Sequence, residues 1–148
     1  MLIGAGYGRK KMAAISELIK ADANGTISFG DYTLSSKSKL DNFEHNGDVY
    51  KVKTFKEITK LERNGMFVYE SVPGTAVTGF SEEENAVEFT VEGPEDAQIT
   101  LELMEETEYE IKINGSSAGV MKTNLGGKLS FSVELEGNDS VEIKVEKR

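Results

Sequence analysis

The residues that most often carry chemistry are few in this chain. His45 is the only histidine, there is no cysteine, and the three arginines are widely separated. A single histidine excludes metal sites built from several histidines, and the lack of cysteine removes thiolate ligands, thiol nucleophiles and disulfides. His45 precedes an Asn-Gly turn, where side chains are usually exposed, so we expect no catalytic role for it.

Carboxylates are abundant, but their spacing points to no particular reaction. Glycoside hydrolysis uses two acids at a set separation, and among 26 acidic residues some pair will always lie near that distance. Two clusters, 22–25 and 136–139, offer oxygen ligands for calcium, yet neither has the full spacing of a calcium loop. Turn formation by Asn, Asp and Gly explains both clusters. We therefore predict no metal site, no cofactor and no catalytic residues.

Three tyrosines in the first half of the chain are candidates for ligand binding. Sugar-binding sites usually present an aromatic platform, and the chain has no tryptophan. Tyr32, Tyr50 and Tyr69 can line a groove, although tyrosines at strand positions more often belong to a core or its rim. We take these three residues as possible ligand-binding residues.

The second half of the chain is predicted to consist of β-strands, which would support a site formed by the first half. Apolar residues alternate with polar ones in five runs, at 87–91, 99–103, 109–113, 129–135 and 141–145. This period of two indicates half-buried antiparallel strands, and turn residues separate the runs. Residues 75–80 and 118–123 add two more strands. Seven short strands predict an Ig-like or fibronectin-like antiparallel β-sandwich over 73–148.

The first half is expected to be a small α+β unit over 12–72. Ile15, Leu18 and Ile19 have helical spacing within 13–21, and Phe55, Ile58 and Leu61 repeat at similar spacing. Strands are predicted at 26–34 and 66–69, and around a hairpin turn at 45–48. The break at Val72-Pro73-Gly74 is the expected domain boundary. A unit of this size forms only a marginal core, so we expect it to pack on the sandwich or on a second subunit.

Charge and composition narrow the partners and the compartment. Residues 1–85 contain 12 acids and 11 bases, a net charge of −1, whereas residues 86–148 contain 14 acids and 6 bases, a net of −8. An acidic surface repels nucleic acid and anionic lipid, so neither is an expected partner. No apolar run is long enough to span a membrane, and the start is a poor secretory signal. We predict a cytoplasmic location.

The first eleven residues form a segment of their own. Met12 and the residues after it read as a natural protein start, and a ribosome-binding site ahead of it would translate as the Gly-Arg-Lys-Lys run at 8–11. We expect 1–11 to be a translated leader or a disordered tail.

Two resemblances bear on function. The segment Tyr109-Glu-Ile-Lys-Ile-Asn-Gly115, followed by 122–131, is similar to the small β-sandwich modules attached to bacterial glycan-processing enzymes. From Met12 onward the chain also resembles a group of small uncharacterised bacterial proteins that sometimes carry the label endosialidase. A sialic-acid hydrolase implies an arginine cluster and an activated tyrosine, and the scattered Arg9, Arg63 and Arg148 do not supply that cluster.

These observations favour a non-enzymatic binding or assembly module whose ligand is an unknown protein or glycan. One alternative is a carbohydrate-binding or carbohydrate-active protein, which the module resemblance and the tyrosines support. A second alternative is a structural homo-oligomer. A glycan-binding assay separates the binding module from the carbohydrate-binding protein. The oligomeric state in solution tests the homo-oligomer.

Overall fold

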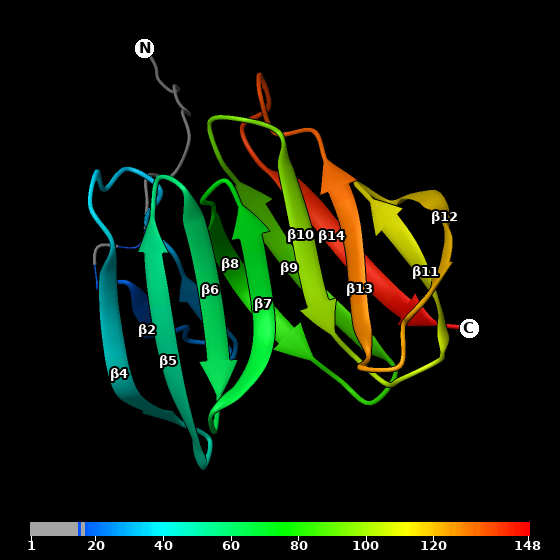
Figure 1. Cartoon of the computed structure of the whole chain (residues 1–148), viewed down its shortest axis with the longest axis horizontal. Helices are drawn as coiled ribbons and strands as arrows, with labels where there is room; N and C mark the ends of the chain where they lie inside the picture. The colour runs from blue at the N-terminus through cyan, green and yellow to red at the C-terminus, as the bar shows by residue number, and fades with distance from the viewer. Residues whose placement is uncertain (1–14, 16) are drawn as a thin grey trace.

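The chain folds into two antiparallel β-sheets that pack face to face (Figure 1). The computed structural model describes Ile15 and residues 17–148. Within these residues, one sheet has six strands in the order β13-β10-β7-β6-β5-β4, and the other has seven in the order β12-β11-β14-β9-β8-β3-β2. The strands are β2 (Ile19–Ala21), β3 (Ile27–Phe29), β4 (Ser38–His45), β5 (Asp48–Phe55), β6 (Ile58–Arg63), β7 (Met66–Val72), β8 (Ala76–Glu82), β9 (Ala86–Glu92), β10 (Ala97–Glu102), β11 (Glu108–Ile113), β12 (Ser116–Lys122), β13 (Lys128–Val133) and β14 (Val141–Lys147).

The alternating runs of the second half form strands, as predicted. In β9, β10, β11, β13 and β14 the apolar members of each run are buried, except for the partly buried Ile113, and most intervening residues are exposed or partly exposed. The two additional strands are also present, as β8 and β12. Burying one face of each strand is what holds the two sheets together. The prediction of a mainly β, sandwich-like fold is therefore confirmed.

The α+β unit expected over 12–72 is wrong, because the described residues contain no helix. Phe55 and Ile58 are cross-strand partners that close the β5–β6 hairpin. Two residues separate such partners, so a tight hairpin gives the same i, i+3 spacing as a helix turn. In the segment predicted as the first helix, Ile19 belongs to β2, and residues 13, 14 and 16 lie outside the described residues.

Both sheets combine strands from the two sides of Pro73. In the six-stranded sheet β7 pairs with β10, and in the seven-stranded sheet β3 pairs with β8. The ranges 12–72 and 73–148 therefore share both sheets. One buried cluster of apolar residues extends from β2 to β14.

The centre of the core is aromatic. Tyr69 has no exposed surface, and its ring stands edge-on to Phe29 and Phe89 at centroid distances of 5.3 and 5.6 Å. Phe80 packs against the same group. Edge-to-face packing suits the charge distribution of aromatic rings and adds to the free energy gained by burial. The strand predicted at 66–69 is thus central in its sheet, although Met66 at its start is 63 % exposed.

A cluster of hydroxyl groups lies beside this aromatic core. The Thr75 hydroxyl is 2.8 Å from the Tyr69 hydroxyl and 2.7 Å from that of Ser71. The Thr59 hydroxyl donates to the Thr75 carbonyl and lies 2.8 Å from the Thr54 hydroxyl. Because each buried hydroxyl has a partner, the cluster links β5, β6 and β7 to the residue before β8 without leaving a polar atom unpaired.

Candidate functional site

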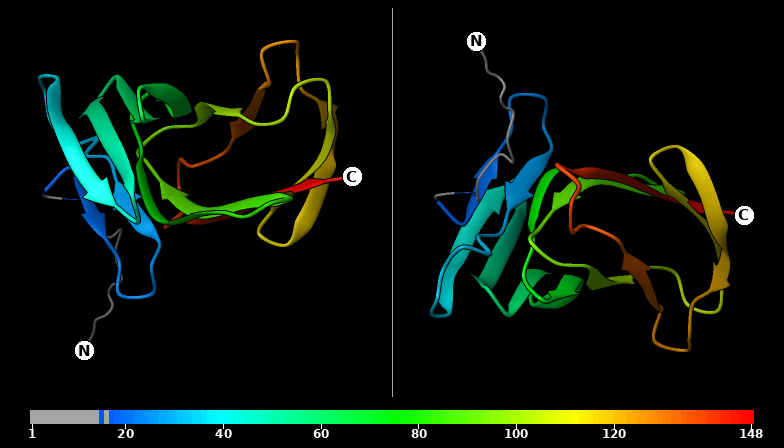
Figure 2. Two further views of the ribbon diagram at one scale, coloured as in Figure 1. Left: turned by 90° about the horizontal axis from the view of Figure 1, so that it is seen from below. Right: turned by 90° about the horizontal axis from the view of Figure 1, so that it is seen from above.

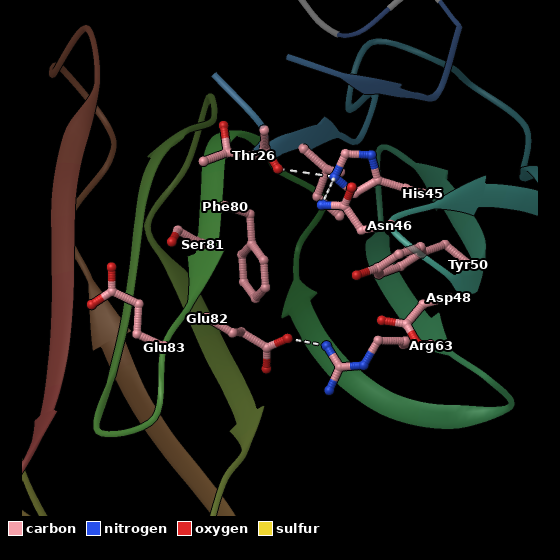
Figure 3. Close-up of a pocket in the computed structure, with 12 residues that line it drawn as sticks. Thr26, His45, Asn46, Asp48, Tyr50, Arg63, Phe80, Ser81, Glu82 and Glu83 are labelled. Atoms are coloured by element: carbon pink, nitrogen blue, oxygen red, sulfur yellow. Dashed lines mark hydrogen bonds and ion pairs between the residues drawn. The ribbon is translucent and has the colours of Figure 1, made fainter. Parts of the chain in front are cut away.

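A polar cleft of about 570 Å³ opens between the two sheets, where β5 and β6 face the end of β8 (Figure 3). The six-stranded sheet contributes His45, Asp48, Tyr50 and Arg63 to its wall. The seven-stranded sheet contributes the end of β8, including Glu82. The cleft is thus lined by groups that donate and accept hydrogen bonds, and by charges of both signs.

Two tight turns at the same end of the six-stranded sheet position the residues on that wall. Asn46-Gly47 joins β4 to β5 and Asn64-Gly65 joins β6 to β7, all four residues having positive φ. Asn and Gly tolerate this conformation, which two-residue hairpins require. The Asn64 amide group also donates to the Asp48 carboxylate at 2.9 Å, which fixes that carboxylate at the cleft.

An ion pair crosses the cleft from one sheet to the other. Arg63 at the end of β6 pairs with Glu82 at the end of β8, and both side chains are partly exposed (Figure 3). Burial alone disfavours the charged guanidinium, but the hydrogen bonds from Arg63 to Glu82 and Tyr50 outweigh it, so the pKa of Arg63 is raised. The pair joins the two sheets at a point where the seven-stranded sheet has an irregular register, between Thr78 and Ser81.

The imidazole of His45 is held in one orientation. Its Nε2 lies 2.9 Å from the Gly25 carbonyl oxygen, which only accepts, so Nε2 carries a proton and donates it. The amide nitrogen of Asn46 lies 3.1 Å from the same ring nitrogen, but because it can only donate, it forms no hydrogen bond with a protonated Nε2. In the neutral ring, Nδ1 then remains as the acceptor. This anchoring ties the β4–β5 turn to the turn before β3.

Tyr50 is the one predicted ligand-binding residue that the structure brings to this cleft. It pairs with Arg63 across β5 and β6, and its hydroxyl points into the cleft (Figure 3). Burial raises the pKa of Tyr50, Arg63 opposes that rise, and the negative charges of Glu82 and Asp48 add to it. The Tyr50 hydroxyl therefore stays protonated and acts as a hydrogen-bonding group.

The other two tyrosines do not join it. Tyr69 is wholly enclosed behind Phe80, and its hydroxyl is used in the buried hydroxyl cluster. The Tyr32 hydroxyl donates to the Glu92 carboxylate at 3.1 Å. Burial, with the nearby negative charge of Glu92, raises the pKa of Tyr32 to about 12. The three tyrosines thus line no common groove.

Sequence reasoning missed most of the cleft. The sequence predicts His45 as an exposed turn residue and shows Arg63 only as one of three scattered arginines. The Asn64-Gly65 pair was the available signal, because a two-residue hairpin there returns the chain antiparallel from Arg63. Nothing in the sequence indicates that Glu82, 19 positions later, pairs with Arg63.

The described residues contain no group of three or more His, Cys, Asp or Glu side chains arranged to hold a metal. At the cluster 22–25, the Asp22 carboxylate accepts hydrogen bonds from the Thr26 and Ser28 hydroxyls. These contacts stabilise the turn between β2 and β3, as the turn interpretation of this cluster predicts.

Comparison with known proteins adds no relative. No protein-family model matches the chain, and neither the curated proteins nor the solved structures contain a significant match. Within the part of the chain that the structure describes, no helix is long and apolar enough to cross a membrane.

Proposed function

We propose that this chain is a non-catalytic binding module that takes a small polar ligand in the cleft between β5, β6 and β8. The observation that carries the proposal is the set of oriented polar groups on both walls. Asp48 is fixed by Asn64, Glu82 by Arg63, and His45 by the Gly25 carbonyl. Groups held in place before binding lose little conformational entropy when a ligand arrives, which favours specific recognition.

The electrostatics of the cleft favour binding over covalent catalysis. A tyrosine nucleophile needs a lowered pKa, and the pKa of Tyr50 is raised. The endosialidase resemblance implies arginines that receive a sugar carboxylate, and Arg63 is already paired with Glu82. With Asp48, Glu82 and Glu83 against one arginine, the wall repels anionic sugars. The cleft is therefore suited to a neutral ligand.

A neutral glycan is the second, more specific candidate. Carboxylates, an amide and a guanidinium together accept and donate hydrogen bonds to neighbouring sugar hydroxyls, and the cleft is large enough for a sugar ring. The resemblance of 86–148 to modules of glycan-processing enzymes supports the same ligand class. The lack of cysteine supports a cytoplasmic location for the module.

The test is NMR titration with neutral mono- and oligosaccharides and, separately, with a panel of neutral, zwitterionic amino acids and small amides. Binding to the cleft is expected to shift the backbone amide signals of residues 45–50 and 81–83. Glu82→Gln keeps the shape of the side chain and removes its charge, so we expect about tenfold weaker binding of the ligand that the wild-type chain binds. Glu134→Gln, an exposed residue after β13, is the matched control and is expected to bind like the wild type.

The outcomes separate the two candidates. Shifts with sugars alone support the glycan, and shifts with another polar class support a binding module of different specificity. Shifts with no probe, or binding that Glu82→Gln and Glu134→Gln weaken equally, would remove the cleft as the site. Hydrolysis of an oligosaccharide that Tyr50→Phe abolishes would contradict the non-catalytic assignment.

A further inference from the structure

One sheet edge, β12, is unusual in its exposure. All seven residues of β12 are exposed, although every residue of the strand except Ala118 pairs with β11 on one side. Val120 and Met121 are 43 and 39 % exposed, and Leu125 in the following turn is 74 % exposed. The strand contains no acidic residue, in a chain with a net charge of −9. β12 lies at the far right of the molecule in Figure 1, and Figure 2 shows that β11 and β12 curve away from the plane of their sheet.

The other three edges are protected in ways that β12 is not. At the opposite end of the same sheet, β2 has only three residues. In the six-stranded sheet, β4 carries charges of both signs and an irregular register between Leu40 and Phe43. The last edge, β13, has its apolar residues Leu129, Phe131 and Val133 already buried. Short, charged or irregular edges resist pairing with another chain. The irregularity of β12 lies at Ala118 and leaves Gly119 to Lys122 regular, so this stretch is the edge most open to pairing.

The backbone of β12 has its free hydrogen-bonding groups at defined residues. The Thr123 N–H donates to the Thr107 carbonyl, so this residue turns its backbone groups toward the β11 side. Successive residues of an antiparallel strand turn their N–H and C=O groups to opposite sides. The register is regular from Gly119 to Lys122, so this alternation holds throughout that stretch. Val120 and Lys122 therefore turn their N–H and C=O groups outward, where none of the strands in the described residues lies.

We propose that β12 pairs antiparallel with β12 of a second copy of this chain, about a two-fold axis that passes between the two Met121 residues. Val120 of each copy then lies opposite Lys122 of the other. This register uses the outward groups of both residues and forms four backbone hydrogen bonds. The two Met121 side chains meet at a non-hydrogen-bonded pair, where side chains on adjacent strands are closest. The pairing joins two seven-stranded sheets into one continuous sheet.

Two features of the sequence fit a second copy as the occupant. No like charges face each other in this register, because Lys122 lies opposite Val120 and beside its own cross-strand neighbour Glu108. The ladder also has a defined end. Ala118 has no partner on β11, since Ile111 pairs with Gly119 and Lys112 with Ser117. A bulge at Ala118 stops the pairing after a few residues, so the assembly is a short, closed dimer and does not extend to a fibre.

A pair of charge substitutions at one position tests the register. Val120→Lys places a lysine opposite Lys122 of the second copy, twice in each dimer, and is expected to weaken the dimer about tenfold or more. Val120→Glu places an acid opposite the same lysine and is expected to preserve dimerisation. Within one chain, residue 120 lies opposite Glu110. We therefore expect Val120→Lys to stabilise the monomer and Val120→Glu to destabilise it, the reverse of their effects on the dimer. Sedimentation equilibrium from micromolar to millimolar protein measures the dimer, and urea unfolding measures the monomer.

Amide hydrogen exchange of the wild-type protein tests the pairing without any substitution. The Val120 and Lys122 amides are expected to exchange rapidly in dilute solution and more slowly as the protein concentration rises, whereas the Thr123 amide is protected throughout. A wild-type chain that stays monomeric at all concentrations would overturn the proposal. So would equal dimerisation of the Val120→Lys and Val120→Glu variants, or a dimer that leaves the Val120 and Lys122 amides unprotected.

Discussion

At the scale of single residues, the tyrosine hydroxyls show how burial has shaped the chemistry of this protein. The pKa values of Tyr32, Tyr50 and Tyr69 are all raised, and in each the largest cause is the loss of hydration on burial. A hydroxyl with a raised pKa stays protonated and serves as a hydrogen-bond donor. The folded chain therefore binds these protons more tightly than the unfolded chain, and its stability must depend on pH in the alkaline range.

Tyr32 gives this dependence a defined window. An unfolded tyrosine ionises near its ordinary pKa of 10, and the pKa of Tyr32 in the folded chain is raised to about 12. Its contribution to stability is complete below pH 10 and is lost as the pH rises from 10 through 12. We expect the free energy of unfolding of Tyr32→Phe to fall less steeply than that of the wild type over this range. Urea unfolding at a series of pH values measures both curves.

The difference between the two curves isolates the titration of Tyr32. Below pH 9 the difference is expected to be constant, because Tyr32→Phe also removes the hydrogen bond to Glu92 at every pH. Above pH 10 the difference is expected to shrink. If the two curves run parallel up to pH 12, Tyr32 does not retain its proton in the folded chain, and the hydrogen bond to Glu92 is weaker than the structure indicates.

At the scale of the element, two hairpins use an asparagine in the same way. In the β11–β12 hairpin the Asn114 N–H donates to the Glu142 carbonyl, and the Glu142 N–H donates to the Asn114 side-chain oxygen, both at 2.8 Å. Asn64 makes the equivalent pair of bonds with Val49, at 2.7 and 3.0 Å. Each turn asparagine thereby fixes its hairpin to the neighbouring strand. The residue type is required by both the positive φ and the side-chain acceptor.

A substitution series at Asn114 separates these two requirements. Asn114→Ala removes the side-chain acceptor and leaves alanine, which tolerates positive φ poorly, at a φ of 51°. We expect the free energy of unfolding to fall by about 1–3 kcal/mol. Asn114→Gly removes the acceptor but relieves the backbone strain, so its loss is expected to be smaller. Asn114→Asp keeps both features and is expected to remain closest to the wild type. Equal losses for the alanine and glycine variants would show that backbone strain contributes nothing.

These hairpins also explain which elements the sequence could predict. Alternation and turn residues were sufficient for β9, β10, β11, β13 and β14, because each of those strands buries one face and exposes the other. The same rules misassigned residues 55–61, where a two-residue turn brings apolar residues to helical spacing. For the site, the structure places the candidate Tyr50 in the cleft, but the residues beside it there were not predictable. The Arg63–Glu82 pair depends on how one sheet lies over the other, and local patterns do not encode that arrangement.

At the scale of the whole molecule, the order of the strands joins the two halves of the chain. The strand that precedes Pro73, β7, lies between β6 and β10, so the six-stranded sheet is continuous across residue 72. The seven-stranded sheet is continuous in the same way through β3 and β8. The cleft itself has walls from both sides of residue 72, with Arg63 on one and Glu82 on the other. Folding of either half thus depends on the other.

This dependence predicts that the full chain unfolds in one transition. The fragment 73–148 lacks β7, which pairs with β10, and β3, which pairs with β8, so two of its strands lose a neighbour. We expect this fragment to have little amide protection alone and to regain it when mixed with the fragment 15–72. For the full chain, urea unfolding followed by circular dichroism and by tyrosine fluorescence is expected to give coincident curves, the mark of a two-state transition.

The opposite results would support the organisation expected from the sequence, in which 73–148 is a sandwich domain of its own. That organisation requires two separate transitions, or a fragment 73–148 with the same amide protection alone as in the full chain. The most informative amides are those of Gln98 to Leu101, because these residues pair with β7 on one side and with β13 on the other. In the fragment, the amides of β10 that bond to β13 can stay protected while those that bond to β7 lose protection. That result would show that the second half keeps its strand pairing but needs the first half to complete both sheets.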